Sequence, residues 1–265
     1  MNIHSISLKG RRDQNEDTHN IITNANGKNS NIKNVNFFSI YDGHGGKQVS
    51  AYLRDNLYKY FLDKTCIYPL KKSYVNTVYS KIQKDLSATS YAQYTGSTAL
   101  IIIMFRHNKS SYINILNLGD CRCIIGRDNI AIPLTKDHKP SWPEEQARIE
   151  SLGGKITFDG YDWRIKDLSV SRAFGDIDAS PYVTHKPELF RYKLEQNDKF
   201  IVMACDGLWD VVSNQDAVNF VLMNSYDKSL KRRIKNNVNI AKKLAEYAYN
   251  KGSTDNISII IIFLD

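Results

Sequence analysis

The chain lacks the features that mark membrane or secreted proteins. Its longest apolar runs, residues 100–105 and 259–264, are far shorter than the roughly 20 residues that a membrane-spanning helix needs. The N-terminus has no basic start followed by an apolar stretch, and Asn2 stands where N-myristoylation requires a glycine. We therefore expect no membrane span and a cytoplasmic or nuclear location.

Cysteine is also scarce, with four residues in a chain of 265. Cys66, Cys121, Cys123 and Cys205 show no paired spacing, and three of them lie in apolar, strand-like segments where free thiols pack as small hydrophobic groups. Cys121 and Cys123 could form half of a soft-metal site, but no second Cys or His pair lies nearby. This pattern predicts free thiols in a reducing compartment.

No internal repeat and no low-complexity linker divides the chain, so we expect a single domain over residues 1–265. Segments rich in Ile, Val, Phe and Tyr indicate strands, and apolar residues at helical spacing indicate helices. The expected strands are residues 3–8, 36–41, 97–105, 111–117, 122–125, 199–205 and 257–264. The expected helices are residues 47–63, 71–87, 143–152, 214–223 and 238–250, with Ser141 as candidate cap of the third.

Three of the expected strands follow one another closely. A polar turn at residues 106–109 joins the first two, and the third begins almost directly after Gly119 and Asp120, which predicts a meander. Residues 24–34 are polar and turn-forming, as expected of a hairpin loop. Runs of strands with grouped helices favour the α+β class, with antiparallel sheets covered by helices. A doubly wound parallel sheet is the alternative.

The charge balance is basic, with 36 Lys and Arg against 28 Asp and Glu, a net charge of +8. Such an excess favours anionic partners, so a nucleic-acid-binding protein or nuclease is one alternative. Much of the excess lies in and before the last expected helix, where it indicates either a solvated helix face or a docking patch. Because no basic strand is interleaved with aromatic residues, we do not expect a nucleic-acid partner.

The chain is instead rich in carboxylates set in glycine-punctuated turns. Asp42, Asp120 and Asp206 each follow an apolar, strand-like run, and Glu16 and Asp255 lie in comparable turns. Strand ends are rigid, and the loops that leave them commonly display catalytic groups. Clustered carboxylates repel one another unless a cation or a shared proton neutralises them, and oxygen ligands suit Mg²⁺ or Mn²⁺. The sequence therefore predicts a hydrolytic site that holds two metal ions.

These motifs resemble those of the metal-dependent serine/threonine protein phosphatases of type 2C. The matching stretches, all in one order, are residues 10–17, 41–46 (YDGHGG), 95–99, 117–122, 137–140, 144–149, 153–154, 170–176 (VSRAFGD), 204–210 (ACDGLWD) and 252–258 (GSTDNIS). The resemblance implies an α+β fold in which two antiparallel sheets form a central sandwich flanked by pairs of helices. It also implies hydrolysis of phosphoserine and phosphothreonine in phosphoprotein substrates.

The resemblance further implies a set of metal ligands. Asp42 would bridge two Mg²⁺ or Mn²⁺ ions, since a carboxylate has two oxygens and paired ions lie roughly 3.5–4 Å apart. The carbonyl of Gly43 would join it on one ion, and Asp206 and Asp255 would hold the other. Glu16 would act mostly through water.

Other residues of the motifs would support this centre. Asp120, together with Asp206, resembles the family's weaker site for a third metal ion. Asp17 and Asn256 would lie behind the ligands, and Asp17 could also act through water. We interpret Asp176, like Arg172 and Asp137, as a group that holds its loop in place.

Two residues are candidates for the chemistry itself. Arg12, four residues before Glu16 as in the family, would bind the phosphate dianion, with Arg11 as the rival. His44 would donate a proton to the departing alkoxide. The alternative for His44 is a turn residue that only hydrogen-bonds its own loop.

One stretch departs from the family pattern. Before residue 170 the family usually carries an Arg-Val turn with a glycine, whereas residues 163–168 are one residue shorter and lack the glycine. We expect this turn to be made differently, which would reshape the edge of the cleft and affect substrate choice.

A catalytically inactive relative that keeps the fold as a binding module is the alternative function. Loss of a ligand aspartate or of the phosphate-binding arginine would mark such a protein. Arg12, Asp42, Asp206 and Asp255 are all present, so we favour an active, monomeric phosphatase.

Overall fold

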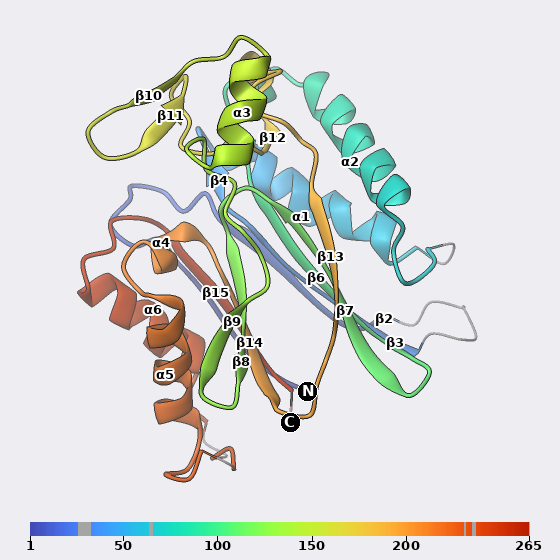
Figure 1. Cartoon of the computed structure of the whole chain (residues 1–265), viewed down its shortest axis with the longest axis vertical. Coiled ribbons are helices and arrows are strands. Elements are labelled where there is room, and N and C mark those ends of the chain that lie inside the picture. Colours follow the sequence, from blue (N-terminus) through green and yellow to red (C-terminus); the bar gives the residue numbers. More distant parts are fainter. Residues whose placement is uncertain (26–32, 64–65, 231, 235–236, 265) are drawn as a thin grey trace.

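Two five-stranded antiparallel sheets pack face to face at the centre of the molecule, with helices on both outer faces (Figure 1). The structure is a computed structural model that describes residues 1–25, 33–63, 66–230, 232–234 and 237–264. The α-β-β-α layers predicted above are confirmed. The antiparallel pairing of both sheets excludes the doubly wound parallel alternative.

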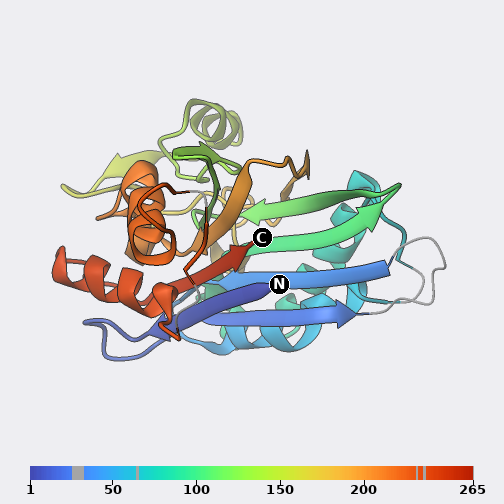
Figure 2. The ribbon, with the colours of Figure 1, turned by 90° about the horizontal axis from the view of Figure 1, so that it is seen from below.

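The first sheet joins both ends of the chain. Its strands lie in the order β1 (Asn2–Leu8), β15 (Ile257–Phe263), β14 (Asp198–Ala204), β8 (Arg122–Arg127) and β9 (Ile130–Pro133). Because β1 pairs with β15, the N- and C-termini lie side by side in both Figure 1 and Figure 2. The second sheet has the order β13 (Glu188–Lys193), β7 (Ser110–Leu118), β6 (Ala99–His107), β3 (Lys33–Tyr41) and β2 (Thr18–Ala25).

The core between the sheets is built from side chains that alternate along each strand. Phe38 and Ile102 of the second sheet and Ile125, Met203 and Ile260 of the first belong to this buried cluster. Alternation places every second residue on the inner face. Full burial of each such side chain contributes roughly 1.5–3 kcal/mol to stability, which fixes the register of the strands.

Helices cover the outer faces through their own apolar stripes. α1 (Gln48–Phe61) and α2 (Lys72–Ser87) pack on the second sheet, and α4 (Asp206–Trp209), α5 (Asn214–Ser225) and α6 (Ile240–Asn250) pack on the first. Side-chain caps start α5 and α6, since Ser213 accepts from the Asp216 amide and Asn239 accepts from the Lys242 amide. No helix within the described ranges has the length and apolar character to cross a membrane.

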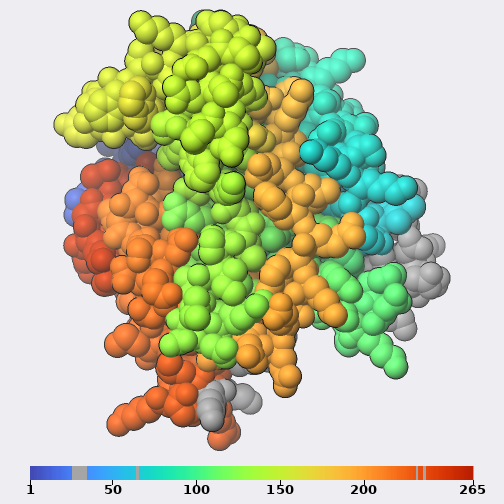
Figure 3. All heavy atoms as spheres, viewed as in Figure 1, coloured from blue at the N-terminus to red at the C-terminus, as the bar shows by residue number. Residues whose placement is uncertain are grey.

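A smaller unit projects beyond one end of the sandwich. It consists of α3 (Pro143–Ser151) and the hairpin of β10 (Ile156–Phe158) and β11 (Trp163–Ile165), and it overhangs the α4–α6 side in Figure 3. The prediction that Ser141 caps α3 is wrong, because Trp142 is the residue that precedes the helix and it makes no side-chain cap. Its extended conformation follows from Pro143, whose ring disfavours helical geometry in the preceding residue.

Short elements connect these layers. β12 (Phe174–Gly175), β5 (Gly96–Ser97) and β4 (Gly43–His44) form a small sheet, and η1 (Tyr91–Gln93) and η2 (Ile177–Ala179) are single 3₁₀ turns. Cys66, Cys121, Cys123 and Cys205 are all buried and free, as predicted.

The predicted meander is only partly right. β6 and β7 pair as a hairpin, but β8 lies in the other sheet, between β14 and β9. The chain crosses from sheet to sheet at Gly119, whose φ of +104° is open to glycine but not to most residues. Most of the predicted hairpin loop, residues 24–34, lies outside the described residues.

Candidate active site

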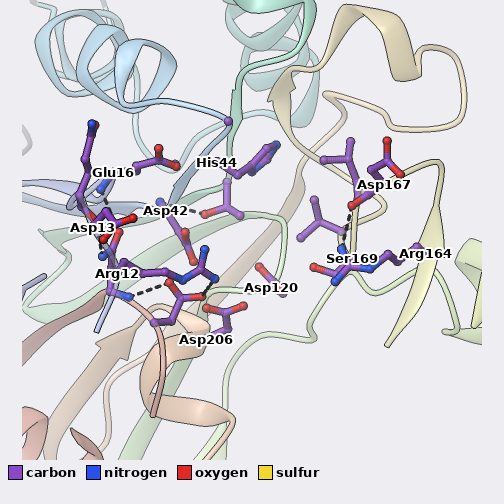
Figure 4. A pocket seen from close by; sticks show the side chains of 18 residues that line it. Arg12, Asp13, Glu16, Asp42, His44, Asp120, Arg164, Asp167, Ser169 and Asp206 are labelled. Atoms are coloured by element: carbon purple, nitrogen blue, oxygen red, sulfur yellow. Dashed lines mark hydrogen bonds and ion pairs between the residues drawn. The ribbon is translucent and has the colours of Figure 1, made fainter. Parts of the chain in front are cut away.

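Carboxylates from both sheets meet at the end of the sandwich that lies under the projecting unit. Asp42 follows β3, Asp120 lies in the turn after β7, and Asp206 opens α4 directly after β14. Together with Glu16 and Asp255 they line a cavity of about 560 Å³ (Figure 4). The predicted grouping of these five residues, which come from positions 16 to 255 of the chain, is therefore seen in the structure.

The centre of this cavity could hold cations. Asp42, Asp120 and Asp206 each offer a carboxylate oxygen, and these oxygens lie within 4.8 Å of one another. Burial, followed by the charges of neighbouring carboxylates, raises the pKa of Asp42 and of Asp206 well above the ordinary value. A bound cation would reduce the repulsion between carboxylates held this close. The oxygen-only ligand set is of the kind that hard divalent ions prefer.

Asp17 lies behind this group. Its side chain is buried, burial raises its pKa to about 6, and neither carboxylate oxygen has a donor in hydrogen-bonding geometry among the described residues. Cys205 stands beside it, but its Sγ already accepts from the Ser258 amide at 3.1 Å. The same Sγ donates to the Asn256 carbonyl at 3.3 Å, so the thiol is already engaged on both sides. The site therefore favours a hard cation over a soft one.

Backbone contacts hold Asp42 in place. Its amide donates to Oγ1 of Thr98 at 3.2 Å, and its carbonyl accepts from the Thr98 amide at 2.9 Å. The end of β3 is thus clamped to the start of β6, so the carboxylate projects into the cavity from a rigid position.

Asn256 ties the two ends of the chain together. Its Oδ1 accepts from the Glu16 amide at 2.9 Å, and its Nδ2 donates to the carbonyls of Lys9 and Gln14 at 2.7 and 2.9 Å. These three bonds fasten the loop that carries Glu16 to the turn that carries Asp255. The supporting role of Asn256 behind metal ligands stays a prediction, and the structure places this residue between the loop of Glu16 and Asp255.

The structure separates the two candidate arginines. Arg12 lines the cavity, and its Nη2 lies 2.6 Å from Oδ2 of Asp255, with 59% of the side chain exposed. Arg11 instead packs its guanidinium 4.9 Å from the ring centre of Tyr249 and donates to the Tyr249 carbonyl. Only Arg12 of the pair is therefore in place to contact a ligand in the cavity.

His44 is paired with Asp176. Nε2 of His44 lies 2.7 Å from Oδ2 of Asp176, and the Asp176 side chain is almost fully buried. Burial lowers the pKa of His44, but the hydrogen bond and charge of Asp176 outweigh it and raise the pKa above its ordinary value. Gly96 makes room for the pair, since a Cβ there would lie 2.1 Å from Asp176 and 2.4 Å from His44.

Sequence reasoning placed Asp176 in its own loop and did not connect it with His44. The two residues are 132 positions apart, and no spacing in the sequence relates them. Arg172 and Asp137 do hold loops as interpreted, with Arg172 paired to Glu145 and Asp137 paired to Arg122, both at 2.6 Å. Lys139, which contacts Asp120, was not identified from the sequence at all.

Strand β11 and the turn that follows it form one wall of the cavity, through Arg164, Asp167 and Ser169 (Figure 4). The turn that lacks the family's glycine runs from Ile165 to Leu168, which are joined by two backbone hydrogen bonds. Lys166 takes the left-handed conformation there, with φ of +53°, and its Nζ lies 2.6 Å from Oδ2 of Asp178. Such a conformation costs a non-glycine residue roughly 1–2 kcal/mol. That this turn reshapes the edge of the cleft relative to the family stays a prediction.

Comparison with known proteins agrees with this geometry. Residues 1–257 match the family described as Protein phosphatase 2C. A PP2C-like domain-containing protein of Acanthamoeba polyphaga mimivirus is 49% identical over 172 residues, which cover 59% of this chain and 96% of that protein. Probable protein phosphatase 2C 7 of Oryza sativa subsp. japonica is 34% identical over 97% of this chain. The chain spans 64% of that rice protein and 64% of a probable protein phosphatase 2C from Arabidopsis thaliana.

Solved structures share the fold at lower identity. A serine-threonine phosphatase 2C from Toxoplasma gondii superimposes with a TM-score of 0.77 at 20% identity, covering 98% of this chain and 94% of that one. A sex determining protein of C. elegans gives a TM-score of 0.85 at 23% identity, covering 100% of this chain and 65% of that one. From the family match over nearly the whole sequence, the chain belongs to the protein phosphatase 2C family.

Proposed function

We propose that this protein is a metal-dependent phosphatase that hydrolyses phosphoserine and phosphothreonine in proteins. The observation that carries the proposal is the meeting of Asp42, Asp120, Asp206 and Asp255 around one cavity, in a chain of the protein phosphatase 2C family. Because Glu16 and Asp255 reach this cavity from opposite ends of the chain, residues 1–265 act as one catalytic domain in this proposal.

The carboxylates would hold two Mg²⁺ or Mn²⁺ ions. Asp42 would bridge them, the carbonyl of Gly43 would bind one, and Asp206 and Asp255 would bind the other, with Glu16 acting through water. Bound divalent ions lower the pKa of water and would thereby supply the attacking hydroxide. Burial, and then the charges of neighbouring carboxylates, raise the pKa of Asp42 and of Asp206, and a bound cation would offset both effects, which supports this assignment.

Arg12 and His44 would act on the substrate directly. The guanidinium of Arg12 can exchange its contact with Asp255 for two parallel hydrogen bonds to a phosphate dianion. His44, whose pKa is raised by the hydrogen bond and charge of Asp176, would donate a proton to the serine or threonine oxygen as it leaves. Asp176 is a positioning residue in this scheme.

The proposal is tested by release of phosphate from a phosphothreonine peptide. Turnover is expected with Mn²⁺ or Mg²⁺ and not with chelator, and Asp206→Asn is expected to lower it by at least about a hundredfold. Asp55→Asn, which removes an exposed carboxylate on α1, is the matched control and should retain full activity. No turnover with any metal, from protein with a native circular-dichroism spectrum, would support the inactive binding module instead.

The role of His44 predicts a dependence on the leaving group. His44→Gln is expected to lower kcat for a phosphothreonine peptide by about 10²–10⁴-fold, since an alkoxide leaves poorly without a proton. The same variant should lose far less activity on p-nitrophenyl phosphate, whose phenolate leaves readily without protonation. An equal loss on both substrates would contradict proton donation and indicate that His44 only supports its loop.

A further inference from the structure

Lys139 places a half-buried positive charge among three carboxylates at the edge of the acidic cluster. Its Nζ lies 2.5 Å from Oδ2 of Asp120, 3.9 Å from Oδ2 of Asp162 and 4.0 Å from Oδ2 of Asp206. The Lys139 side chain is 19% exposed and that of Asp120 is 2% exposed. The ammonium therefore offsets part of the negative charge of Asp120 and Asp206.

The loop that carries Lys139 is fixed to the turn that carries Asp120. The His138 amide donates to the Gly119 carbonyl at 3.0 Å, and the Gly119 amide donates to Nδ1 of His138 at 3.1 Å. Asp137 is held in turn by its ion pair with Arg122. These contacts keep the backbone of Lys139 beside the turn that carries Asp120.

A divalent ion bound to Asp120 and Asp206 would have to lie about 2.0–2.6 Å from their oxygens. An ion at that distance would lie close to the Lys139 ammonium, which contacts the same two carboxylates. Two cations this close repel strongly where solvent is largely excluded. We propose that Lys139 is a tethered cation that competes with a third divalent ion for Asp120 and Asp206. The inference rests on the proposed two-ion site, which shares the ligand Asp206 with it, whereas Asp42 and Asp255 form no ion pair with Lys139 among the described residues.

A direct contact between Lys139 and substrate phosphate is the competing interpretation. The residues that line the cavity include Asp120 and Asp206 but not Lys139, as far as the described residues extend. The ammonium therefore lies behind the carboxylates, where an incoming phosphate would meet Asp120 first. This placement favours competition for the carboxylates over binding of substrate.

Equilibrium dialysis with Mn²⁺ on the full chain, without substrate, tests the inference. Wild type is expected to bind two ions tightly and a third weakly, and Lys139→Met is expected to bind the third with a dissociation constant at least tenfold lower. Lys139→Arg keeps the charge and should match wild type. Asp120→Asn, added to Lys139→Met, should abolish the gained affinity.

The outcomes separate this inference from the proposed function. A third ion bound no more tightly by Lys139→Met, or three ions bound equally tightly by wild type, would overturn the competition while leaving the two-ion site intact. Wild type that binds no Mn²⁺ would overturn the two-ion site itself. If Lys139→Met does not fold, Lys139→Gln removes the charge while keeping a donor for Asp120, and the same tenfold change is expected.

Discussion

Asp42→Asn is expected to lower kcat/KM for a phosphothreonine peptide on the order of a thousandfold and, at the same time, to stabilise the metal-free protein. The loss of activity follows from the central position of this carboxylate, which is the only one proposed to contact both ions. An amide has the same shape but carries no charge, so it cannot bridge two cations.

The gain in stability follows from the electrostatics of the empty cluster. Burial first, and then the charges of Asp17 and Asp206, raise the pKa of Asp42 well above its ordinary value, so its ionised form opposes folding. We expect the variant to gain about 1–2 kcal/mol at pH 7 in chelator, which corresponds to roughly 2–8 °C in Tm for a domain of this size. Addition of Mn²⁺ should reverse the order, because only wild type gains ligand-linked stability.

The raised pKa of Asp42 also determines how the stability of the metal-free protein changes with pH. Because the folded protein holds the Asp42 proton more tightly than the unfolded chain does, ionisation of this group lowers the stability of metal-free wild type as pH rises above the ordinary carboxyl range. The advantage of Asp42→Asn should therefore grow from pH 4 to pH 7, as measured by thermal unfolding in chelator, with Asp55→Asn as control. A variant less stable than wild type in chelator would contradict the expected destabilisation by ionised, buried Asp42.

Much of this site was predictable because its signals are local. The apolar runs before Asp42 and Asp206 indicate buried strands, and an acidic residue at the end of a rigid strand is placed by that strand alone. The five predicted helices likewise carry their apolar residues at helical spacing and pack as that spacing requires. Local pattern and tertiary structure agree at these positions.

The elements that were missed are those fixed by their partners. β2 (THNIITNA) and β13 (ELFRYK) are edge strands with many half-buried or exposed positions, so they show no continuous apolar run and take their form from pairing with β3 and β7. The residues around Gly119 are compatible both with a chain reversal within one sheet and with a crossing to the other sheet. The choice depends on the partners of β8, which lie at residues 130–133 and 198–204.

Contacts between distant loops were equally hidden. The His44–Asp176 pair and the approach of Lys139 to Asp162 depend on how separate loops pack over the cavity. A histidine followed by glycines predicts a turn, and a lysine in a polar loop predicts a solvated charge. Neither pattern carries information about the residue at the other end of the contact.

Glu145→Gln is expected to lower the free energy of unfolding at pH 7 by about 3 kcal/mol. Glu145 is buried on α3, with Oε1 2.6 Å from Nη2 of Arg172 and Oε2 2.9 Å from Nη2 of Arg148. Burial alone would raise its pKa, but the hydrogen bonds from Arg172 and Arg148 outweigh it and lower the pKa from 4.5 to about 2. A shift of that size corresponds to about 3 kcal/mol, and loss of one partner of a buried ion pair typically costs about 3–5 kcal/mol.

The pH dependence distinguishes this ion pair from simple packing. A depressed carboxyl pKa stabilises the fold fully above the unfolded value of 4.5, and the contribution is lost as pH falls through about 2. The difference between wild type and Glu145→Gln, measured by urea unfolding, should therefore be constant from pH 5 to pH 7 and shrink as pH falls below 4.5. Glu144→Gln, at the exposed neighbouring position, should change stability by less than about 0.5 kcal/mol.

A double-mutant cycle with Arg172 tests whether the Glu145–Arg172 ion pair holds the segment that leads to Asp176. Arg148 donates to the Ser171 carbonyl at 3.1 Å and Arg172 donates to the Lys186 carbonyl at 3.2 Å, so Glu145 fastens α3 to the segment that leads to Asp176. Glu145→Gln combined with Arg172→Gln should cost less than the sum of the single changes, because each single change leaves a buried charge unmatched. Additive costs would show that the two residues contribute independently, and the ion pair would then not be what holds this loop beneath His44.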